Sequence, residues 1–308
     1  MRAGIYVERA AYENLPAWQR YAVRVHAFAR KHPDAVLCLE SAAVLLGLPY
    51  FNEPKDIHVY DAGRSASRRF GDVAVHTSAN PREFGNVRGV LTTSPLDTAV
   101  DLIRVLPLAQ GLAVADAAVS PRQEGFTSVD AIRDLGLSQQ NRRGRGPMAW
   151  VLDHADGGAE SPAESVSRAV ITWCGFEHPK LQREFHYEDE VDRVDFLFPS
   201  VNAIGEADGW GKYDFDDPRK AEQHLRDEKR REDRLRRHGH AFARWDLGDV
   251  WRVTPLVNAL SAAGVPIAHS REPAKLASLK TRPREKPYLP RETSREAVSD
   301  AGCGFSGR

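Results

Sequence analysis

The chain has 308 residues, of which 42% are hydrophobic and 28% are charged, a balance typical of an ordinary soluble protein. Its 43 basic and 43 acidic side chains cancel, so any affinity for nucleic acid would have to come from a local patch. No apolar run approaches the roughly 18 residues of a membrane-spanning helix. The three cysteines stand singly, which argues against a disulfide framework or a structural zinc site.

The length favours two domains and a tail, because one hydrophobic core seldom organises more than roughly 200 residues. The first residues include acidic side chains and no apolar core of the signal-peptide type. We therefore expect a cytoplasmic protein with no membrane partner.

Two helices are predicted near the start of the chain. Apolar residues at helical spacing, including Tyr21 and Val25, predict an amphipathic helix over 18–30. The alanine- and leucine-rich stretch 40–48 predicts a short buried helix that ends at Gly47, where a left-handed residue is favoured.

Strands and a further helix follow. The segments 57–61 and 73–77 have strand character, and the arginine-rich stretch between them suits an exposed loop. Either Thr93 or Ser94 can cap a helix that begins at Pro95.

The N-terminal half resembles a known family. The motifs SAAVLLGL and TTSPLDTAVDL, followed by an alanine-rich helix, lie between Glu40 and Val119 and look like the N-terminal part of actinobacterial AbiEi-type antitoxins. The resemblance implies an α+β domain over 1–138 and a possible toxin or other protein partner. Such antitoxins usually begin with a winged-helix DNA-binding unit, and the segment before Glu40 is too short for a complete one.

The segment 139–159 is expected to link the two halves. Its start, QQNRRGRG at 139–146, is rich in glycine and arginine and has no periodicity, which is typical of a hinge. Two interpretations stay open: a solvated linker, or a loop that contacts phosphate.

The second domain is predicted to open with a capped helix. Ser161 can be the N-cap, Pro162 the first helical residue and Glu164 the acid three positions on, which together make a capping box, and Gly175 can end the helix. Glu164 therefore has two interpretations: it bonds back to the Ser161 amide, or it serves as an outer metal ligand.

Three acidic residues are expected to meet on two neighbouring strands, 191–198 and 202–208. Side chains two apart on a strand share a face, so Glu206 and Asp208 point the same way. Asp195 projects from its strand away from the core and can meet Glu206. The alternating apolar residues are expected to face the core together: Val194, Phe196 and Phe198.

Crowded carboxylates predict a bound cation, because like charges placed together raise the energy of their ionised forms. Oxygen ligands without histidine or cysteine suit Mg²⁺ or Mn²⁺. The only basic residue near this cluster in the sequence is Arg193. An ion pair that locked Asp195 or Glu206 to an arginine would contradict the metal-site prediction.

The stretch from Glu160 to Trp251 carries a second resemblance. The motifs ESPAES, VDFLFP, GEADGWGKYDF and EKRREDRLRRHGHAFARWDLGDV look like the PD-(D/E)XK nuclease superfamily, in the branch similar to very-short-patch-repair (Vsr) endonucleases. The resemblance implies a restriction-endonuclease-like mixed sheet flanked by helices over 160–260. It also implies metal-dependent cleavage of DNA, with Asp195 and Glu206 as the metal ligands and Glu164 as the acid of the first helix.

One position departs from the superfamily pattern. Asp208 stands where a lysine is usual, although many members of this branch read E-x-D-G there. Lys212, four residues further on, is our candidate for the missing positive charge, and the alternative is an exposed loop lysine. The resemblance thus gives Asp208 the role of a supporting acid.

A long charged helix is predicted over 218–238, followed by a last strand. Its side chains Arg230, Arg231 and Arg234 could contact a phosphate backbone, although a charge run is more often a solvated face. The segment 268–308 is rich in proline and poor in apolar clusters, so we expect it to be disordered.

Together these features predict a two-domain α/β protein. The predicted function is metal-dependent endonucleolytic hydrolysis of DNA. The alternative is a DNA-binding, antitoxin-like transcriptional regulator whose nuclease fold is catalytically inactive.

Overall fold

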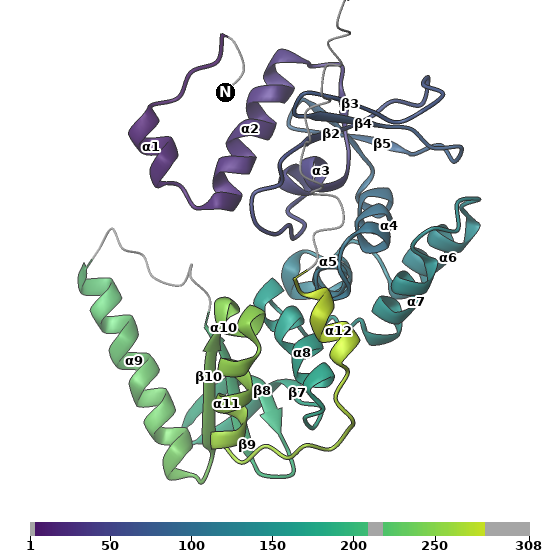
Figure 1. Ribbon diagram of the computed structural model, residues 1–308. Coiled ribbons are helices and arrows are strands. Elements are labelled where there is room, and N and C mark those ends of the chain that lie inside the picture. Colours follow the sequence, from purple (N-terminus) through teal and green to yellow (C-terminus); the bar gives the residue numbers. More distant parts are fainter. Residues whose placement is uncertain (1–3, 209–217, 281–308) are drawn as a thin grey trace, which may run out of the picture.

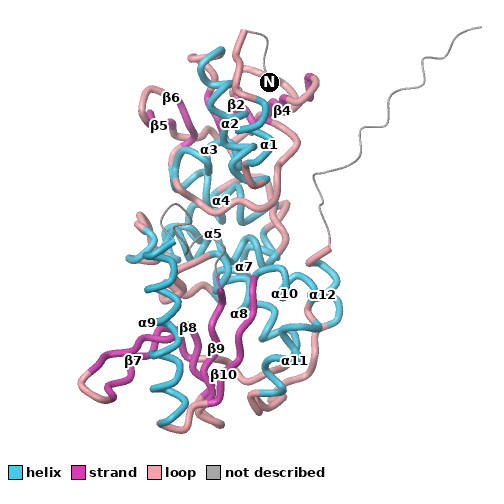
Figure 2. Tube along the Cα trace, turned by 90° about the vertical axis from the view of Figure 1, so that its left-hand side faces the viewer, coloured by secondary structure: helices cyan, strands magenta, loops and turns pink. Residues whose placement is uncertain are grey.

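The computed structural model describes residues 4–208 and 218–280. It is a mixed α/β protein with two mixed sheets, one toward each end of the molecule (Figure 1). Helices fill the space between the sheets, as the view in Figure 2 also shows. None of the described helices is both long enough and apolar enough to cross a membrane.

The N-terminal sheet has six strands in the order β3-β4-β2-β1-β6-β5. Parallel pairing joins β2 to β4 and β1 to β6, and the other neighbours are antiparallel. The strands are β1 (Val36–Leu37), β2 (Ile57–Tyr60), β3 (Arg68–Phe70), β4 (Val73–His76), β5 (Phe84–Val87) and β6 (Val90–Thr93). The two predicted strands are confirmed as β2 and β4, but the arginine-rich stretch between them is not all loop, because β3 pairs with β4 as an exposed edge strand.

Local signals placed the first helices correctly. After α1 (Arg9–Asn14), α2 (Ala17–Lys31) buries Tyr21 and Val25 against the sheet, and α3 (Leu39–Leu46) ends at Gly47 in the left-handed conformation. The hydroxyl of Ser94 accepts the amide of Asp97 and so caps α4 (Pro95–Val105).

The segment 139–159 is not a linker. It contains α7 (Arg145–His154), whose residues Met148, Val151 and Leu152 are buried at helical spacing. This helix packs against α4, α5 (Leu108–Val119) and α6 (Val129–Ser138), and its Trp150 contacts Trp173 of α8 (Pro162–Cys174). The short η1 (Pro121–Gln123) lies against α5. One contiguous hydrophobic core runs from Cys38 to Leu276 through these helices, so the predicted division into two domains is not confirmed.

The C-terminal sheet has the order β10-β9-β8-β7, with β10 parallel to β9 and the other neighbours antiparallel. Its strands are β7 (Lys180–Tyr187), β8 (Glu190–Phe198), β9 (Ala203–Asp208) and β10 (Ala241–Asp246). Helix α9 (Pro218–Arg237) lies on one side of the sheet, and α8 and α11 (Thr254–Ala262) lie on the other (Figure 1). The short α10 (Leu247–Arg252) follows β10 directly.

The predicted alternation along β8 holds only in part. The two phenylalanines of β8 belong to the main core, whereas Val194 packs with Ile204 and Leu235 in a separate small cluster beneath α9. On the neighbouring strand, Gln182 lies opposite Asp195 and has a φ of 51°. The regular strand geometry is therefore disturbed beside Asp195, which the sequence pattern did not show.

The disorder predicted from residue 268 is wrong for 268–280. These residues pack along α8 and include α12 (Pro273–Ser278), which buries Leu276. The close approach requires a glycine at Gly175, because a Cβ there would lie 2.3 Å from the carbonyl oxygen of His269. The remainder of the predicted tail lies outside the described residues.

Candidate functional site

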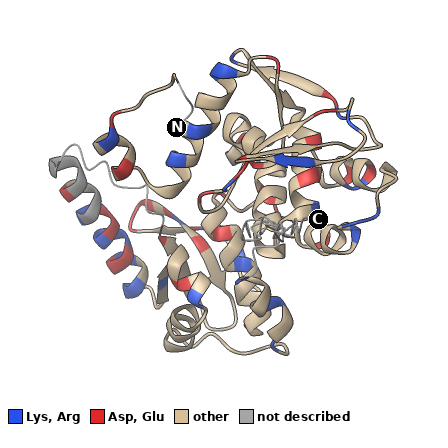
Figure 3. Cartoon of the chain, turned by 45° about the horizontal axis from the view of Figure 1, so that its top comes forward, with Lys and Arg blue, Asp and Glu red and all other residues tan. Residues whose placement is uncertain are grey.

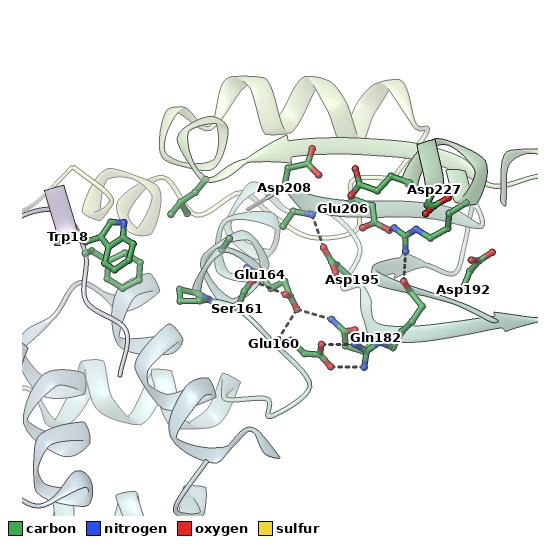
Figure 4. Close-up of a pocket in the computed structure, with 18 of the residues that line it drawn as sticks. Trp18, Glu160, Ser161, Glu164, Gln182, Asp192, Asp195, Glu206, Asp208 and Asp227 are labelled. Carbon is green, nitrogen blue, oxygen red and sulfur yellow. Dashed lines mark hydrogen bonds and ion pairs between the residues drawn. The ribbon is translucent and has the colours of Figure 1, made fainter. Parts of the chain in front are cut away.

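A cleft of about 1100 Å³ is lined by all four acids that the sequence predicts for the site (Figure 4). Its lining is strongly acidic, and the carboxylates are Glu160, Glu164, Asp192, Asp195, Glu206, Asp208, Asp227 and Glu228. The basic lining residues are Arg193, Arg231 and Arg234. A polyanion would meet unfavourable charge here unless cations compensated it.

Glu164 is fully engaged by hydrogen bonds at the start of α8. The hydroxyl of Ser161 accepts the Glu164 amide at 3.2 Å and donates to Glu164 Oε1 at 2.8 Å. Oε2 accepts from the amide of Glu160 and from Gln182 Nε2, both at 2.9 Å. The cap thus forms as predicted on the serine side, but the backbone amide that the carboxylate accepts from is that of Glu160 rather than that of Ser161. Burial, and then the charge of Asp195, raise the pKa of Glu164.

Asp195 and Glu206 face each other across β8 and β9, as predicted (Figure 4). The amide of Ala207 donates to Asp195 Oδ2 at 2.9 Å, which fixes that carboxylate beside the neighbouring strand. Glu206 is 4% exposed. Burial, and then the like charge of Asp195, raise the pKa of Glu206 to about 7.

An arginine also reaches Glu206. From α9, Arg231 Nη2 donates to Glu206 Oε1 at 2.7 Å, and Nη1 donates to the carbonyl of Arg193 at 2.6 Å. This is the ion pair that the sequence analysis named as contrary to a metal site. It does not balance the charge of Glu206, because the pKa of that carboxyl stays raised with Arg231 and Arg244 in place.

Asp208 lies at the edge of the cleft with 49% of its side chain exposed. Arg244 on β10 reaches it at 3.6 Å and also contacts Glu232 at 3.2 Å. Burial alone would lower the pKa of Arg244, but the charges of four acids outweigh it and raise that pKa: Asp208, Glu232, Glu206 and Glu228. Asp208 is therefore part of a surface charge network.

The three predicted nucleic-acid contacts on α9 have different surroundings. Arg231 and Arg234 turn toward the sheet, where Arg234 pairs with the buried Asp192 through two bonds of 2.7 and 2.6 Å. The side chain of Arg230 is 76% exposed and lies 3.8 Å from Asp227. Along α9, at the left of Figure 3, acidic and basic side chains alternate, so the helix offers no purely basic face. Lys212 lies outside the described residues.

Several residues of the cleft were missed by the sequence analysis. Gln182 donates to Glu164, and Arg193, the basic residue near the acidic cluster in the sequence, forms two 2.8 Å bonds to Glu160. On the opposite wall stand Trp18, Tyr50 and Phe51 from the N-terminal half of the chain. No local motif marks these contacts, because each joins segments far apart in the sequence.

The donor chemistry of the cleft fits a hard divalent cation. Within the described ranges, no group of three or more His, Cys, Asp or Glu side chains is disposed to hold a metal ion. Mg²⁺, however, is commonly bound through one or two carboxylates, with waters and substrate phosphates completing the shell. Asp195 and Glu206 supply such a pair.

Comparison with known proteins identifies two relatives in Mycobacterium tuberculosis, from strains CDC 1551 / Oshkosh and ATCC 25618 / H37Rv. Each is 35% identical over 173 residues and is described as an uncharacterized protein. The match covers 56% of this chain and 62% of each relative, so the chain spans less than two thirds of their length. No family model matches the chain, and no solved structure matches it significantly.

Proposed function

We propose that the cleft hydrolyses DNA phosphodiester bonds with the help of a divalent cation, Mg²⁺ or Mn²⁺, held by Asp195 and Glu206. The observation that carries the proposal is the convergence of these two carboxylates in one acidic cleft, where Glu206 stays under-compensated although Arg231 contacts it. The mixed sheet with flanking helices also agrees with the nuclease resemblance.

A bound divalent cation would polarise the phosphodiester and lower the pKa of a coordinated water. The residues of the chain have distinct parts in this scheme. The Ala207 amide orients Asp195, and Arg231 holds Glu206 in place when no cation is present. Glu164, with both oxygens engaged, acts on the site through its negative charge and through Gln182 rather than as a ligand.

Asp208 belongs to the rim of the proposed site, and Lys212, outside the described residues, is assigned to the site from its place in the sequence. Asp208 supports the site as a partly exposed acid, held near Arg244. Lys212 follows it closely in the sequence and would stabilise developing negative charge.

The test is incubation of the full chain with supercoiled plasmid and either Mg²⁺ or Mn²⁺. Nicking should appear with metal, disappear with EDTA, and be reduced at least a hundredfold in Asp195→Asn and in Glu206→Gln. Glu222→Gln, which alters an exposed acid of α9 outside the cleft, is the matched control and should keep full activity. Wild-type protein that never nicks plasmid, or nicking that survives both cleft substitutions, would refute the proposal.

The Arg231–Glu206 ion pair favours a second candidate function. If that pair is permanent, the nuclease-like fold serves as an inactive scaffold in a DNA-binding, antitoxin-like regulator whose partner is a toxin or another protein. Gel-shift measurements without metal distinguish the two. Binding without nicking, unchanged in Asp195→Asn and Glu206→Gln, would support the regulator.

The same ion pair can be tested directly. Arg231→Gln removes the competing charge from Glu206, so a cation site predicts several-fold tighter Mn²⁺ binding in this variant, measured by calorimetry. A permanent structural pair predicts no Mn²⁺ binding by either protein.

A further inference from the structure

A second, smaller cavity of about 160 Å³ lies in the N-terminal half, between the ends of β2 and β4, helix α4 and the segment 139–143. It shares no lining residue with the acidic cleft. The polar lining of this cavity is mainly basic or neutral, whereas that of the cleft is mainly acidic. It includes Tyr60, His76, Arg82, Arg104, Gln139 and Arg143.

Arg104 brings a buried positive charge to this cavity. Its Nε and Nη2 donate to the carbonyl of Arg143 at 3.0 and 2.7 Å, and further bonds reach the Asn141 carbonyl and the side-chain oxygen of Gln139. All of these acceptors are neutral. Burial lowers the pKa of Arg104; the charge of Asp101 opposes this shift, and the charges of Arg145 and Arg82 add to it.

The segment 139–143 is shaped around this arginine. Gly144, directly after it, has a φ of 80°, and a Cβ there would lie 2.3 Å from the carbonyl oxygen of Arg104. Only glycine accommodates both the conformation and the contact. The stretch that suggested either a hinge or a phosphate-contacting loop is thus an ordered wall of the cavity.

Local acids do not neutralise the positive charge of the cavity. Asp101 is the acid that lines it, and both of its oxygens are taken by Arg82 at 2.9 and 2.8 Å. Over the described part of the chain, neither Arg104 nor Arg143 forms an ion pair with a carboxylate. Among the described residues, the cavity therefore has one buried positive charge, Arg104, and one exposed positive charge, Arg143, that no acid pairs with.

Two polar groups of the wall also lack partners. Tyr60 Oη and Gln139 Nε2 are buried and form no hydrogen bond, although their residues line the cavity. Buried donors without acceptors are rare in folded proteins, and an unfilled ion or ligand position is one reason for them. Both groups can donate to oxygen.

We propose that this cavity binds a small oxyanion, a phosphate or a carboxylate, between Arg104, Arg143, Tyr60 and Gln139. A volume of about 160 Å³ leaves room for such an anion. The proposal is independent of the hydrolytic one, since it involves neither the acidic cleft nor a metal.

The test is calorimetric titration of the full chain with inorganic phosphate and, separately, with acetate, at constant ionic strength and with EDTA. Arg143→Gln should weaken binding about tenfold, since it removes one charge-assisted hydrogen bond. Arg142→Gln is the matched control: the same change at the preceding exposed arginine, which does not line the cavity, should alter the affinity less than about twofold. Tyr60→Phe should weaken binding several-fold without loss of charge.

Preference for phosphate or for acetate identifies which oxyanion the cavity takes. Thermal unfolding of each variant confirms that it is folded before it is titrated. Absence of heat with both anions, or equal loss in Arg142→Gln and Arg143→Gln, would overturn the proposal, because the interaction would then be absent or a non-specific charge effect.

Discussion

Asp116 on α5 and Glu206 on β9 are both buried carboxylates that an arginine reaches, yet their other neighbours differ. Asp116 is 0% exposed, and Arg168 Nη2 donates to it at 2.7 Å while the Asp156 amide donates at 2.8 Å. Burial raises its pKa, but Arg168 and the hydrogen bonds all favour its charged form. Glu206 has Arg231, but it also has the like charge of Asp195.

The comparison separates a structural ion pair from a candidate functional one. The pair formed by Asp116 joins helices α5 and α8, and the charge and hydrogen-bonding neighbours of Asp116 all favour its ionised form, although burial still raises the pKa. In the cleft, two acids share a site that costs free energy to maintain, and such costs are common where a ligand or ion binds. Substitutions in both pairs, each with a control, test this difference.

The largest expected effect is in the central pair. Asp116→Ala leaves Arg168 buried without a counter-charge and should lower the free energy of unfolding by about 3–5 kcal/mol, measured by urea denaturation. Asp116→Asn still accepts from Asp156 and should lose less. A loss below about 1 kcal/mol for the alanine variant would show that this pair contributes as little as a surface one.

Glu206→Gln should raise the free energy of unfolding instead of lowering it. A raised pKa means that the native state favours the protonated carboxyl, so the wild type loses stability as the pH rises from 4.5 through about 7. Glutamine keeps the acceptor for Arg231 and avoids this loss. We expect the variant to be more stable than the wild type at pH 8, by on the order of 2–3 kcal/mol, and equal to it at pH 4.

Glu222→Gln is the control for this pH series. Its carboxylate is exposed and pairs with Arg226 one helical turn away, so the substitution should change stability by less than about 0.5 kcal/mol at either pH. If Glu206→Gln were destabilising at pH 8, the Arg231 pair would outweigh burial and the charge of Asp195, and Glu206 would resemble Asp116.

Asp195→Asn tests separately how much the charge of Asp195 contributes to the raised pKa of Glu206. Removing the like charge should lower the pKa of Glu206 by about one unit, equivalent to about 1.4 kcal/mol, as followed by NMR titration of the glutamate carbons. The asparagine oxygen can still accept from the Ala207 amide. Asp208→Asn is the matched control and should shift this pKa less, since Asp208 is half exposed and pairs with Arg244. Equal shifts of the Glu206 pKa in the two variants would mean that the negative charges of the cleft act together, without a specific effect of Asp195.

Local signals allowed much of the fold to be predicted from sequence. The N-cap serines of α4 and α8, the left-handed glycines after α3 and α8, and the two-residue spacing of Glu206 and Asp208 each depend on a few adjacent residues. These features act within one turn or one strand, so the sequence expresses them directly.

The partners of the acids could not be predicted in the same way. Arg231 reaches Glu206 from α9, and its position depends on how α9 docks through Leu235. Arg244 reaches Asp208 from β10, and its position depends on the pairing of β10 with β9. The charge-rich sequence of α9 looks similar on every face, so it does not show which arginine turns inward. Helix α7 was predicted as part of a linker because glycine and arginine at its start are typical of loops. The buried residues Met148 and Val151 follow them.

The smallest expected effect on stability is at Arg230, the exposed arginine beside the inward-turned Arg231. Its only described ion pair is a 3.8 Å contact with Asp227 at the surface, so Arg230→Gln should change the free energy of unfolding by less than about 0.5 kcal/mol. Arg234→Gln, which strips the buried Asp192 of two bonds, should cost several times more. If α9 contacts DNA, Arg230→Gln should also lower the salt dependence of binding by about one counterion, measured by anisotropy at several salt concentrations. An unchanged salt dependence would remove Arg230 from the nucleic-acid interface and leave α9 as a helix whose arginines serve the sheet beneath it.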